Sequence, residues 1–179
     1  INKTVDKNPN GATFYFALFG DNTGNKRISD VISLTVPAGQ TEASVTMENL
    51  DYTSIKTINQ ANNIYLLETN AKGEKIDNSK SAYSVKYGEN EQTEPYEIDI
   101  TKAENTVKVT NTKQTKPITV TKTLTVPTTD KDTFYFAVFT KKTIDDKTVF
   151  VRYEEAGIKS LTMPNTDNTL NFDIPQTGE

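Results

Sequence analysis

The sequence contains no cysteine and no histidine among its 179 residues. These two absences exclude disulfides, thiol nucleophiles and Ser-His or Cys-His catalytic arrangements, and they remove the commonest metal ligand. We therefore expect no metal site and no cofactor. If the protein is extracellular, its small domains must be stabilised by a means other than disulfide bonds.

Long apolar runs and basic stretches are also missing. No apolar run approaches membrane-spanning length and no signal peptide is visible, so we expect no membrane segment in this chain. The net charge is −4, from 24 acidic and 20 basic residues, and no basic stripe indicates a nucleic acid partner. Hydrophobic residues make up 34%, which is enough for modest β-sandwich cores.

One aromatic stretch occurs twice. Residues 13–19 read Thr-Phe-Tyr-Phe-Ala-Leu-Phe, and residues 133–139 differ from them at a single position. Aromatic residues suit a half-buried strand, and a near-repeat of this composition indicates duplicated units. Ser-Leu-Thr-Val-Pro at residues 33–37 and Ser-Leu-Thr-Met-Pro at residues 160–164 extend the repeat.

The remaining pattern predicts short strands separated by turns, without a long helical segment. The fold class is therefore all-β, with a sandwich of seven to nine strands in the first unit. We expect a complete sandwich over residues 1–114, a linker at 115–117 and the N-terminal part of a second unit over 118–179. Because the strand pattern is already present at Ile1, we expect this chain to be a piece of a longer precursor.

Three polar residues fall where such a sandwich would bury them: Lys3, Glu68 and Asn111. Each has a plainer interpretation. A lysine in an edge strand usually reaches water, an asparagine near a strand end usually belongs to a turn, and a glutamate after two leucines often faces solvent. For any one of them taken alone, the residue type favours the plainer interpretation.

Three motifs resemble the collagen-adhesin B-type (CnaB) domain of Gram-positive surface adhesins and sortase-assembled pilins. They are Lys-Thr-Val at residues 3–5, Tyr-Leu-Leu-Glu-Thr-Asn-Ala-Lys-Gly at 65–73 and Val-Thr-Asn-Thr at 109–112. The resemblance implies tandem immunoglobulin-like sandwiches, the second one incomplete. Lys72 stands where the family usually has proline, a departure in the loop.

The resemblance also implies a spontaneous isopeptide bond between Lys3 and Asn111, assisted by Glu68. Burial among aromatic residues would free the Lys3 amine, and Glu68 would hydrogen-bond the amide oxygen and pass a proton to the leaving ammonia. The reaction occurs once per molecule, so it is maturation and not enzymatic turnover. Phe14 or Phe16 would form the apolar wall, in addition to packing the core.

The second unit has its own counterpart of Lys3. Lys122 precedes its aromatic stretch by nearly the same spacing, but the residues that correspond to Glu68 and Asn111 are not found in residues 118–179. We therefore expect Lys122 to be unreacted.

The C-terminal residues allow two interpretations. Ile174, Pro175, Gln176, Thr177 and Gly178 resemble a sortase sorting signal, which would link the chain to a neighbouring pilin subunit or to the cell wall. Alternatively they form a strand and turn inside the second unit, since they follow the repeat at the position of residues 49–50. The second interpretation is slightly favoured, because a half sandwich leaves unpaired edges.

These observations favour a structural stalk or pilin module, extracellular and either cell-wall-anchored or part of a pilus. The alternative is an adhesin domain whose loops contact a host ligand, although the loops at residues 20–27 and 88–95 lack an aromatic cluster. A glycosidase with paired carboxylates is disfavoured, since no such pair is recognisable on facing strands. The sequence does not identify the ligand or the lysine of any intermolecular link.

Overall fold

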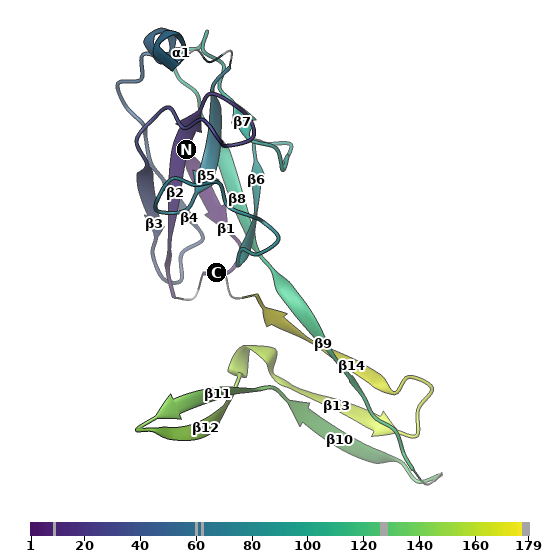
Figure 1. Ribbon diagram of the computed structural model, residues 1–179. Coiled ribbons are helices and arrows are strands. Elements are labelled where there is room, and N and C mark those ends of the chain that lie inside the picture. The colour runs from purple at the N-terminus through teal and green to yellow at the C-terminus, as the bar shows by residue number, and fades with distance from the viewer. Residues whose placement is uncertain (9, 60, 62, 126–128, 177–179) are drawn as a thin grey trace. The chain divides into compact units, whose positions relative to one another are not determined.

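The computed structural model describes residues 1–8, 10–59, 61, 63–125 and 129–176 (Figure 1). Its regular secondary structure is almost entirely strand, and the prediction of an all-β chain is confirmed. Helical structure in the described residues consists of α1 (Tyr52–Asn59) and the short 3-10 turn η1 (Glu154–Ala156). The chain divides into two compact units. Unit one contains Ile1–Gln114 and Gln176, and unit two contains Thr115–Pro175.

Unit one consists of two four-stranded sheets. The first has the order β4-β1-β8-β6, formed by β4 (Glu42–Ser44), β1 (Asn2–Val5), β8 (Lys108–Lys113) and β6 (Tyr83–Tyr87). The second has the order β3-β2-β5-β7, formed by β3 (Ile32–Val36), β2 (Ala12–Phe19), β5 (Tyr65–Thr69) and β7 (Tyr96–Glu97). All pairs are antiparallel except β1 with β8, which run parallel.

The core of unit one lies between these two sheets. Strand β2 contributes Phe14, Phe16 and Leu18 to it, because alternate residues of a strand point to the same face. Ala17 and Phe19 point to the opposite face and pack in a second, smaller apolar cluster. The aromatic stretch is therefore buried on both faces, which explains why it contains almost no polar residue.

Helix α1 lies between β4 and β5 of unit one. Asp51 caps the first turn, where its Oδ1 atom accepts hydrogen bonds from the backbone N–H groups of Thr53 and Ser54, both at 3.1 Å. An aspartate in this position satisfies backbone donors that have no partner within the helix. No helix in the described part of the chain has the length and apolarity needed to cross a membrane.

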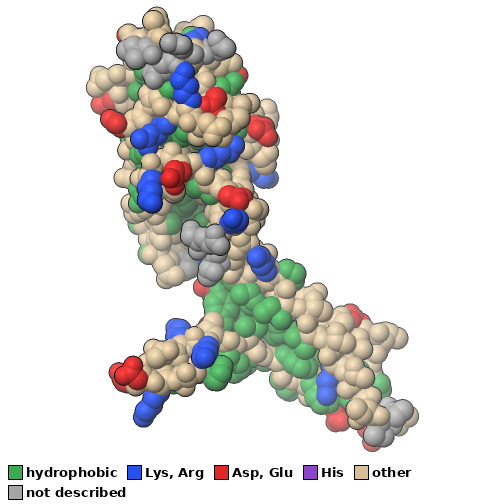
Figure 2. Space-filling view, in the orientation of Figure 1, with side chains coloured by type: hydrophobic (Ala, Val, Ile, Leu, Met, Phe, Trp, Pro, Cys, Tyr) green, Lys and Arg blue, Asp and Glu red, His purple; other side chains and the backbone are tan. Residues whose placement is uncertain are grey.

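Unit two contains three separate two-stranded antiparallel ladders. They are β9 (Thr115–Thr121) with β14 (Thr169–Pro175), β10 (Asp132–Ala137) with β13 (Ile158–Met163), and β11 (Phe139–Ile144) with β12 (Lys147–Arg152). Many of its apolar side chains reach the surface, as Figure 2 shows. Unit two is therefore much less well buried than unit one.

The structure differs from the sequence prediction at the junction and in the second aromatic stretch. Residues 115–117, predicted as a linker, form the first part of β9 and pair with β14. Pro117 is compatible with this pairing, because proline is tolerated on edge strands and both strands of a two-stranded ladder are edges. The second aromatic stretch is split, since β10 ends at Ala137 and Phe139 begins β11.

Candidate functional site

Three charged or polar side chains meet in the core of unit one. Lys3 is 1% exposed, Glu68 4% and Asn111 1%. Burial on this scale is rare for lysine and glutamate unless they are paired, so the plainer interpretations of these residues do not describe their positions. The three residues come from β1, β5 and β8, which lie far apart in the sequence.

Strand alternation directs each of the three side chains inward. Glu68 shares the inner face of β5 with Leu66, whereas Leu67 belongs to the cluster on the opposite face. Asn111 shares the inner face of β8 with Val109, and Val109 lies directly beside Lys3 in the parallel β1–β8 ladder. Lys3 and Asn111 therefore lie on adjacent strands of one sheet, and Glu68 faces them from the other sheet.

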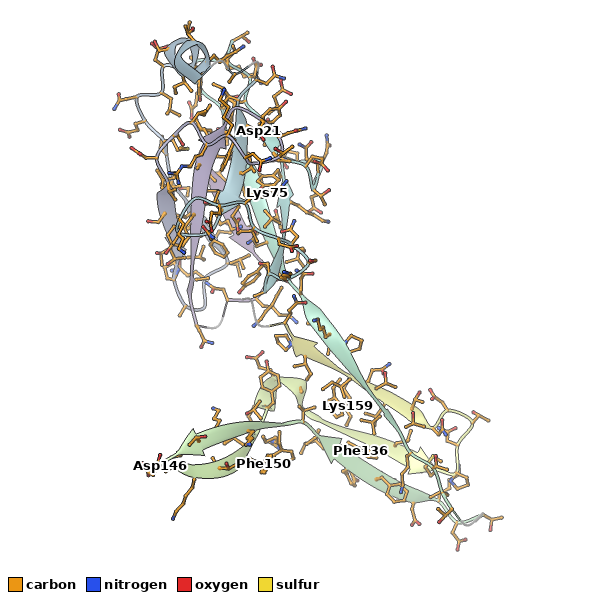
Figure 3. The ribbon with its side chains drawn as sticks, in the orientation of Figure 1. Asp21, Lys75, Phe136, Asp146, Phe150 and Lys159 are labelled. Atoms are coloured by element: carbon orange, nitrogen blue, oxygen red, sulfur yellow. The ribbon has the colours of Figure 1, made fainter. Side chains whose placement is uncertain are left out.

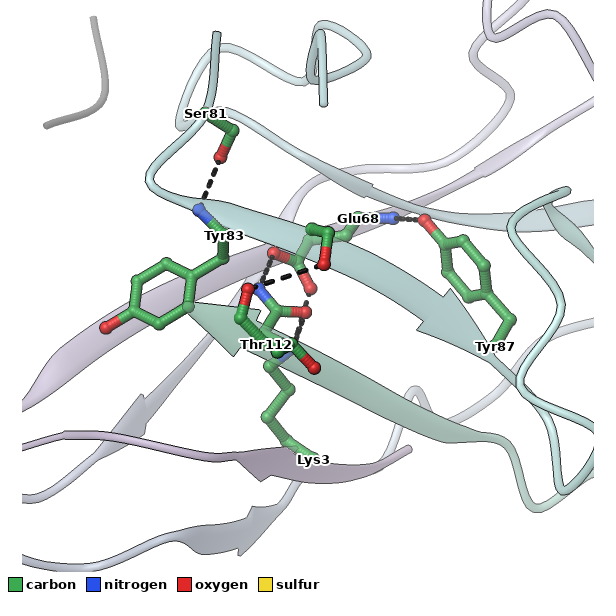
Figure 4. A network of polar contacts seen from close by, with 8 residues as sticks. Lys3, Glu68, Ser81, Tyr83, Tyr87 and Thr112 are labelled. Atoms are coloured by element: carbon green, nitrogen blue, oxygen red, sulfur yellow. Dashed lines mark hydrogen bonds and ion pairs between the residues drawn. The ribbon is translucent and has the colours of Figure 1, made fainter. Parts of the chain in front are cut away.

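The side chains form a closed polar triangle (Figure 4). Lys3 Nζ donates to Glu68 Oε2 at 2.8 Å and also contacts Asn111 Oδ1. Asn111 Nδ2 donates to Glu68 Oε1 at 2.7 Å. Glu68 was expected to contact the amide oxygen, but here it contacts the amide nitrogen, and Lys3 contacts the oxygen. One carboxyl group thus touches both the amine and the amide nitrogen.

Burial changes the protonation of Lys3. Desolvation lowers its pKa to about 8, although the neighbouring Glu68 carboxylate acts in the opposite direction. Lys3 Nζ lies 4.3 Å from the ring centroid of Phe14 and 6.0 Å from that of Phe16. Phe14 is therefore the nearer part of the apolar wall, which the sequence left undecided between the two. Because its pKa is lowered, a far larger fraction of Lys3 is in the neutral, nucleophilic form than for an exposed lysine.

Tyr87 is a site residue that the sequence analysis missed. It lies on β6, is 6% exposed, and its hydroxyl accepts a hydrogen bond from the backbone N–H of Glu68 at 2.8 Å. This donor is open to a side-chain partner because β7 pairs with β5 only at Tyr65 and Leu66. Burial also raises the pKa of Tyr87. The sequence signal was a tyrosine at an inward position of a strand, since a buried tyrosine hydroxyl needs a polar partner.

We predict that Tyr87→Phe lowers the free energy of unfolding by about 1–3 kcal/mol, because it leaves the buried N–H of Glu68 without an acceptor. Denaturant titration of the full chain measures this change. Tyr83→Phe is the matched control on the same strand, since the Tyr83 hydroxyl makes only an exposed 3.2 Å contact with the Lys7 carbonyl. Equal losses in the two variants would show that the hydrogen bond from the Glu68 backbone to the Tyr87 hydroxyl makes no specific contribution to stability.

Lys122 repeats part of this site in unit two. Its Nζ atom lies 4.4 Å from the ring centroid of Phe134, close to the 4.3 Å between Lys3 Nζ and the ring centroid of Phe14. Unlike Lys3, Lys122 is only partly buried. Among the described residues of unit two, no carboxylate or asparagine side chain is recorded in hydrogen-bond contact with it.

The candidate sorting residues are divided between the two units. Ile174 and Pro175 end β14, where they pair with Lys116 and Thr115 of β9. The backbone N–H of Gln176 donates to the carbonyl of Gln114 at 2.7 Å. Thr177 and Gly178 lie outside the described residues. The first half of the stretch is therefore a paired strand, as in the interpretation that places it inside unit two.

Among the described residues, no group of three or more Asp or Glu side chains is arranged to hold a metal ion. The site in unit one is instead suited to chemistry between its own side chains: an amine, a carboxamide and a carboxyl group held in contact away from water. These groups need no cofactor to react with one another.

Comparison with known proteins gives little further information. No protein-family model matches the chain, and comparison with curated proteins gave no match. Among solved structures, the chain aligns with the major pilin protein (T-13) from Streptococcus pyogenes at 12% identity and a TM-score of 0.31. The alignment covers 99% of this chain and 76% of that one. A similarity this low does not establish a shared fold.

Proposed function

We propose that unit one is a structural stalk module, of the CnaB-type immunoglobulin-like class, stabilised by an isopeptide bond between Lys3 and Asn111. The observation that carries this proposal is the buried contact among Lys3, Glu68 and Asn111. The amine of Lys3 and the carboxamide of Asn111 both contact the Glu68 carboxyl group, so the lysine and the asparagine are placed to react with each other.

The reaction is balanced without any other reagent. Lys3 transfers a proton to Glu68 Oε2, and the neutral Nζ attacks the side-chain carbonyl carbon of Asn111. The new Nζ–Cγ bond forms as the Cγ–Nδ2 bond breaks, and Glu68 passes its proton to Nδ2 through its other oxygen. Nζ then gives up a second proton to the Glu68 carboxylate and becomes an amide N–H. Ammonia leaves. The fold holds the reacting groups together, and this proximity replaces the catalytic power of a separate enzyme.

The bond would join the parallel strands β1 and β8, which are the first and last strands of unit one. A force applied at the two ends of the unit would then pass through a covalent link, and the residues between Lys3 and Asn111 would carry little of it. The isopeptide bond would therefore give a chain without cysteine the covalent cross-link that disulfides provide in other extracellular domains. We accordingly place the protein on a Gram-positive cell surface, in a pilus or attached to the wall.

Single-molecule pulling on the full chain tests the mechanical role. We predict that no extension event from unit one appears, because the 108-residue span between Lys3 and Asn111 cannot lengthen. In Lys3→Ala the same span should unfold and add about 370 Å of extended chain. An event of that length in the unmodified protein would refute the stalk proposal.

A further inference from the structure

A bond between Lys3 and Asn111 releases ammonia inside the core of unit one. The leaving nitrogen, Asn111 Nδ2, lies 2.7 Å from Glu68 Oε1, and both side chains are buried. Ammonia that stays beside the new amide can attack it and restore the original side chains, because it remains close to the same carbonyl carbon. Net formation of the bond therefore needs a place that receives the ammonia.

A small cavity lies beside Glu68. It has a volume of about 20 Å³, and its lining includes the buried residues Glu68, Val85 and Tyr87. A volume of roughly 10–15 Å³ is enough for one water molecule, and ammonia is of similar size. The cavity therefore has room for one molecule of water or ammonia.

The strand pairing of β5 explains why there is a gap at this point. One edge of β5 is occupied by β2 along its whole length. On the other edge, β7 pairs with β5 only as far as Leu66, and the next partner is Lys75, which forms an isolated bridge with Thr69. Lys75 is labelled in Figure 3 and belongs to the segment that follows β5. Residues 67–68 lie between these two partners, and in the described part of the chain no strand covers them on this side.

Tyr87 gives the cavity a polar group. Its hydroxyl accepts the backbone N–H of Glu68 at 2.8 Å, as Figure 4 shows. For the hydrogen of the same hydroxyl, no acceptor is recorded among the described residues. Buried polar groups are nearly always hydrogen-bonded, to protein or to ordered water. Because Tyr87 and Glu68 both line the cavity, a small molecule there can accept this hydrogen bond.

The cavity also borders the residue next to the reacting amide. Val85 lines the cavity and lies directly opposite Asn111 in the antiparallel β6–β8 ladder. Directly opposite residues project to the same face of a sheet, with Cβ atoms roughly 4.5–5.5 Å apart. Asn111 is thus flanked by two residues that line the cavity: Val85 beside it and Glu68 across from it.

The remaining part of the lining lies at the surface of unit one. Lys75, Asn78 and Thr93 are exposed, and Ile76 is half-buried. These residues belong to the segments between β5 and β6 and between β6 and β7, outside the two sheets. The cavity therefore lies between the buried site and solvent.

We propose, on the basis of the Lys3–Asn111 reaction put forward above, that this cavity is the exit site for ammonia. It binds a small neutral molecule that forms hydrogen bonds: water before the reaction and ammonia as it leaves. When the Cγ–Nδ2 bond of Asn111 breaks, Nδ2 takes the proton of Glu68 and departs as NH₃ into the cavity, where it replaces the water bound to the Tyr87 hydroxyl. From there it passes to solvent, and its loss makes the bond permanent.

Narrowing the cavity tests the proposal. Val85→Ile adds one methylene beside Asn111, and Ile76→Phe enlarges a half-buried side chain on the solvent side. The full chain is made by cell-free synthesis, and intact mass is followed over time. We expect both variants to lose ammonia about tenfold more slowly than the unmodified chain, a factor equivalent to about 1.4 kcal/mol at the barrier. Both should reach the same final mass, because the reacting groups are unchanged.

Val36→Ile is the matched control, since Val36 is also a buried core valine but is not among the residues that line the cavity. It should react at the rate of the unmodified chain, and circular dichroism checks that all three variants fold. Unmodified rates in both cavity variants, or equal slowing in Val36→Ile, would overturn the exit proposal. Slowing in Val85→Ile alone would also overturn it, because that change acts next to the Asn111 amide.

A crystal structure of the unreacted Glu68→Gln protein provides a second test. We expect one ordered water in the cavity, within hydrogen-bond distance of the Tyr87 hydroxyl, and a dry cavity would contradict the proposal. Failure of the Lys3 chemistry is distinguishable from failure of the exit site. It would appear as an undiminished mass in the unmodified chain at all times, whereas failure of the exit site leaves the ammonia loss intact and insensitive to the cavity variants.

Discussion

Glu68→Ala should yield a protein with its full sequence mass, whereas the unmodified chain should be lighter by one ammonia. The reason lies in the two contacts of the Glu68 carboxyl group, at 2.8 Å to the Lys3 amine and 2.7 Å to the Asn111 amide nitrogen. Without this group, the proton on Lys3 has no acceptor, and the leaving nitrogen has no donor. We expect bond formation to fall below detection by intact mass spectrometry.

A second substitution separates proton transfer from packing. Glu68→Gln retains the size of the side chain and its ability to hydrogen-bond Asn111, but it cannot accept a proton from Lys3. It should therefore also retain the full mass while remaining folded, as judged by circular dichroism. If Glu68→Gln loses ammonia as readily as the unmodified protein, Glu68 does not act in proton transfer. Glu97, an exposed glutamate on β7, provides the matched control, and Glu97→Gln should leave the ammonia loss unchanged.

Loss of the bond should also produce a large fall in stability. Lys3→Met retains an unbranched side chain of similar length against Phe14 but cannot form the cross-link. The bond closes a span of 108 residues, and by the loop-entropy relation for disulfides such a closure stabilises the folded state by about 4–5 kcal/mol. For a domain of this size that corresponds to a drop in melting temperature on the order of 20 °C.

The control for this prediction is Lys86→Met, which removes an exposed lysine that is paired with Glu91 at 3.0 Å on the surface. Exposed ion pairs contribute at most about 1 kcal/mol, so this variant should melt close to the unmodified protein. Differential scanning calorimetry measures both changes. A Lys3→Met protein that melts within a few degrees of the unmodified chain would show that no cross-link stabilises unit one.

The aromatic stretch illustrates what the sequence could predict. Its alternation identified β2 correctly, and its near-copy predicted β10, because inward and outward positions in a strand follow from local spacing alone. Lys3, Glu68 and Asn111 are brought into contact by strand register across two sheets. Spacing does not determine that register, so the resemblance to a known domain was needed to select them.

Other features depended on tertiary contacts and could not be predicted. Tyr87 looked like an ordinary core residue, and its role arises because β7 leaves the backbone of Glu68 unpaired. Pro117 suggested a linker, but an edge strand tolerates proline, and β9 begins before it. The orientation of the Asn111 amide, with its nitrogen toward Glu68, also depends on the completed triangle of side chains.

The most direct test of the account is a tryptic map of the unmodified protein. A bond between Lys3 and Asn111 blocks cleavage after Lys3, and it joins residues 1–7 to residues 109–113 in one branched product, lighter than the two peptides by one ammonia. We predict that this product is found and that it is absent from Glu68→Ala. Recovery of residues 1–3 and 109–113 as separate, unmodified peptides from the folded protein would contradict the central claim.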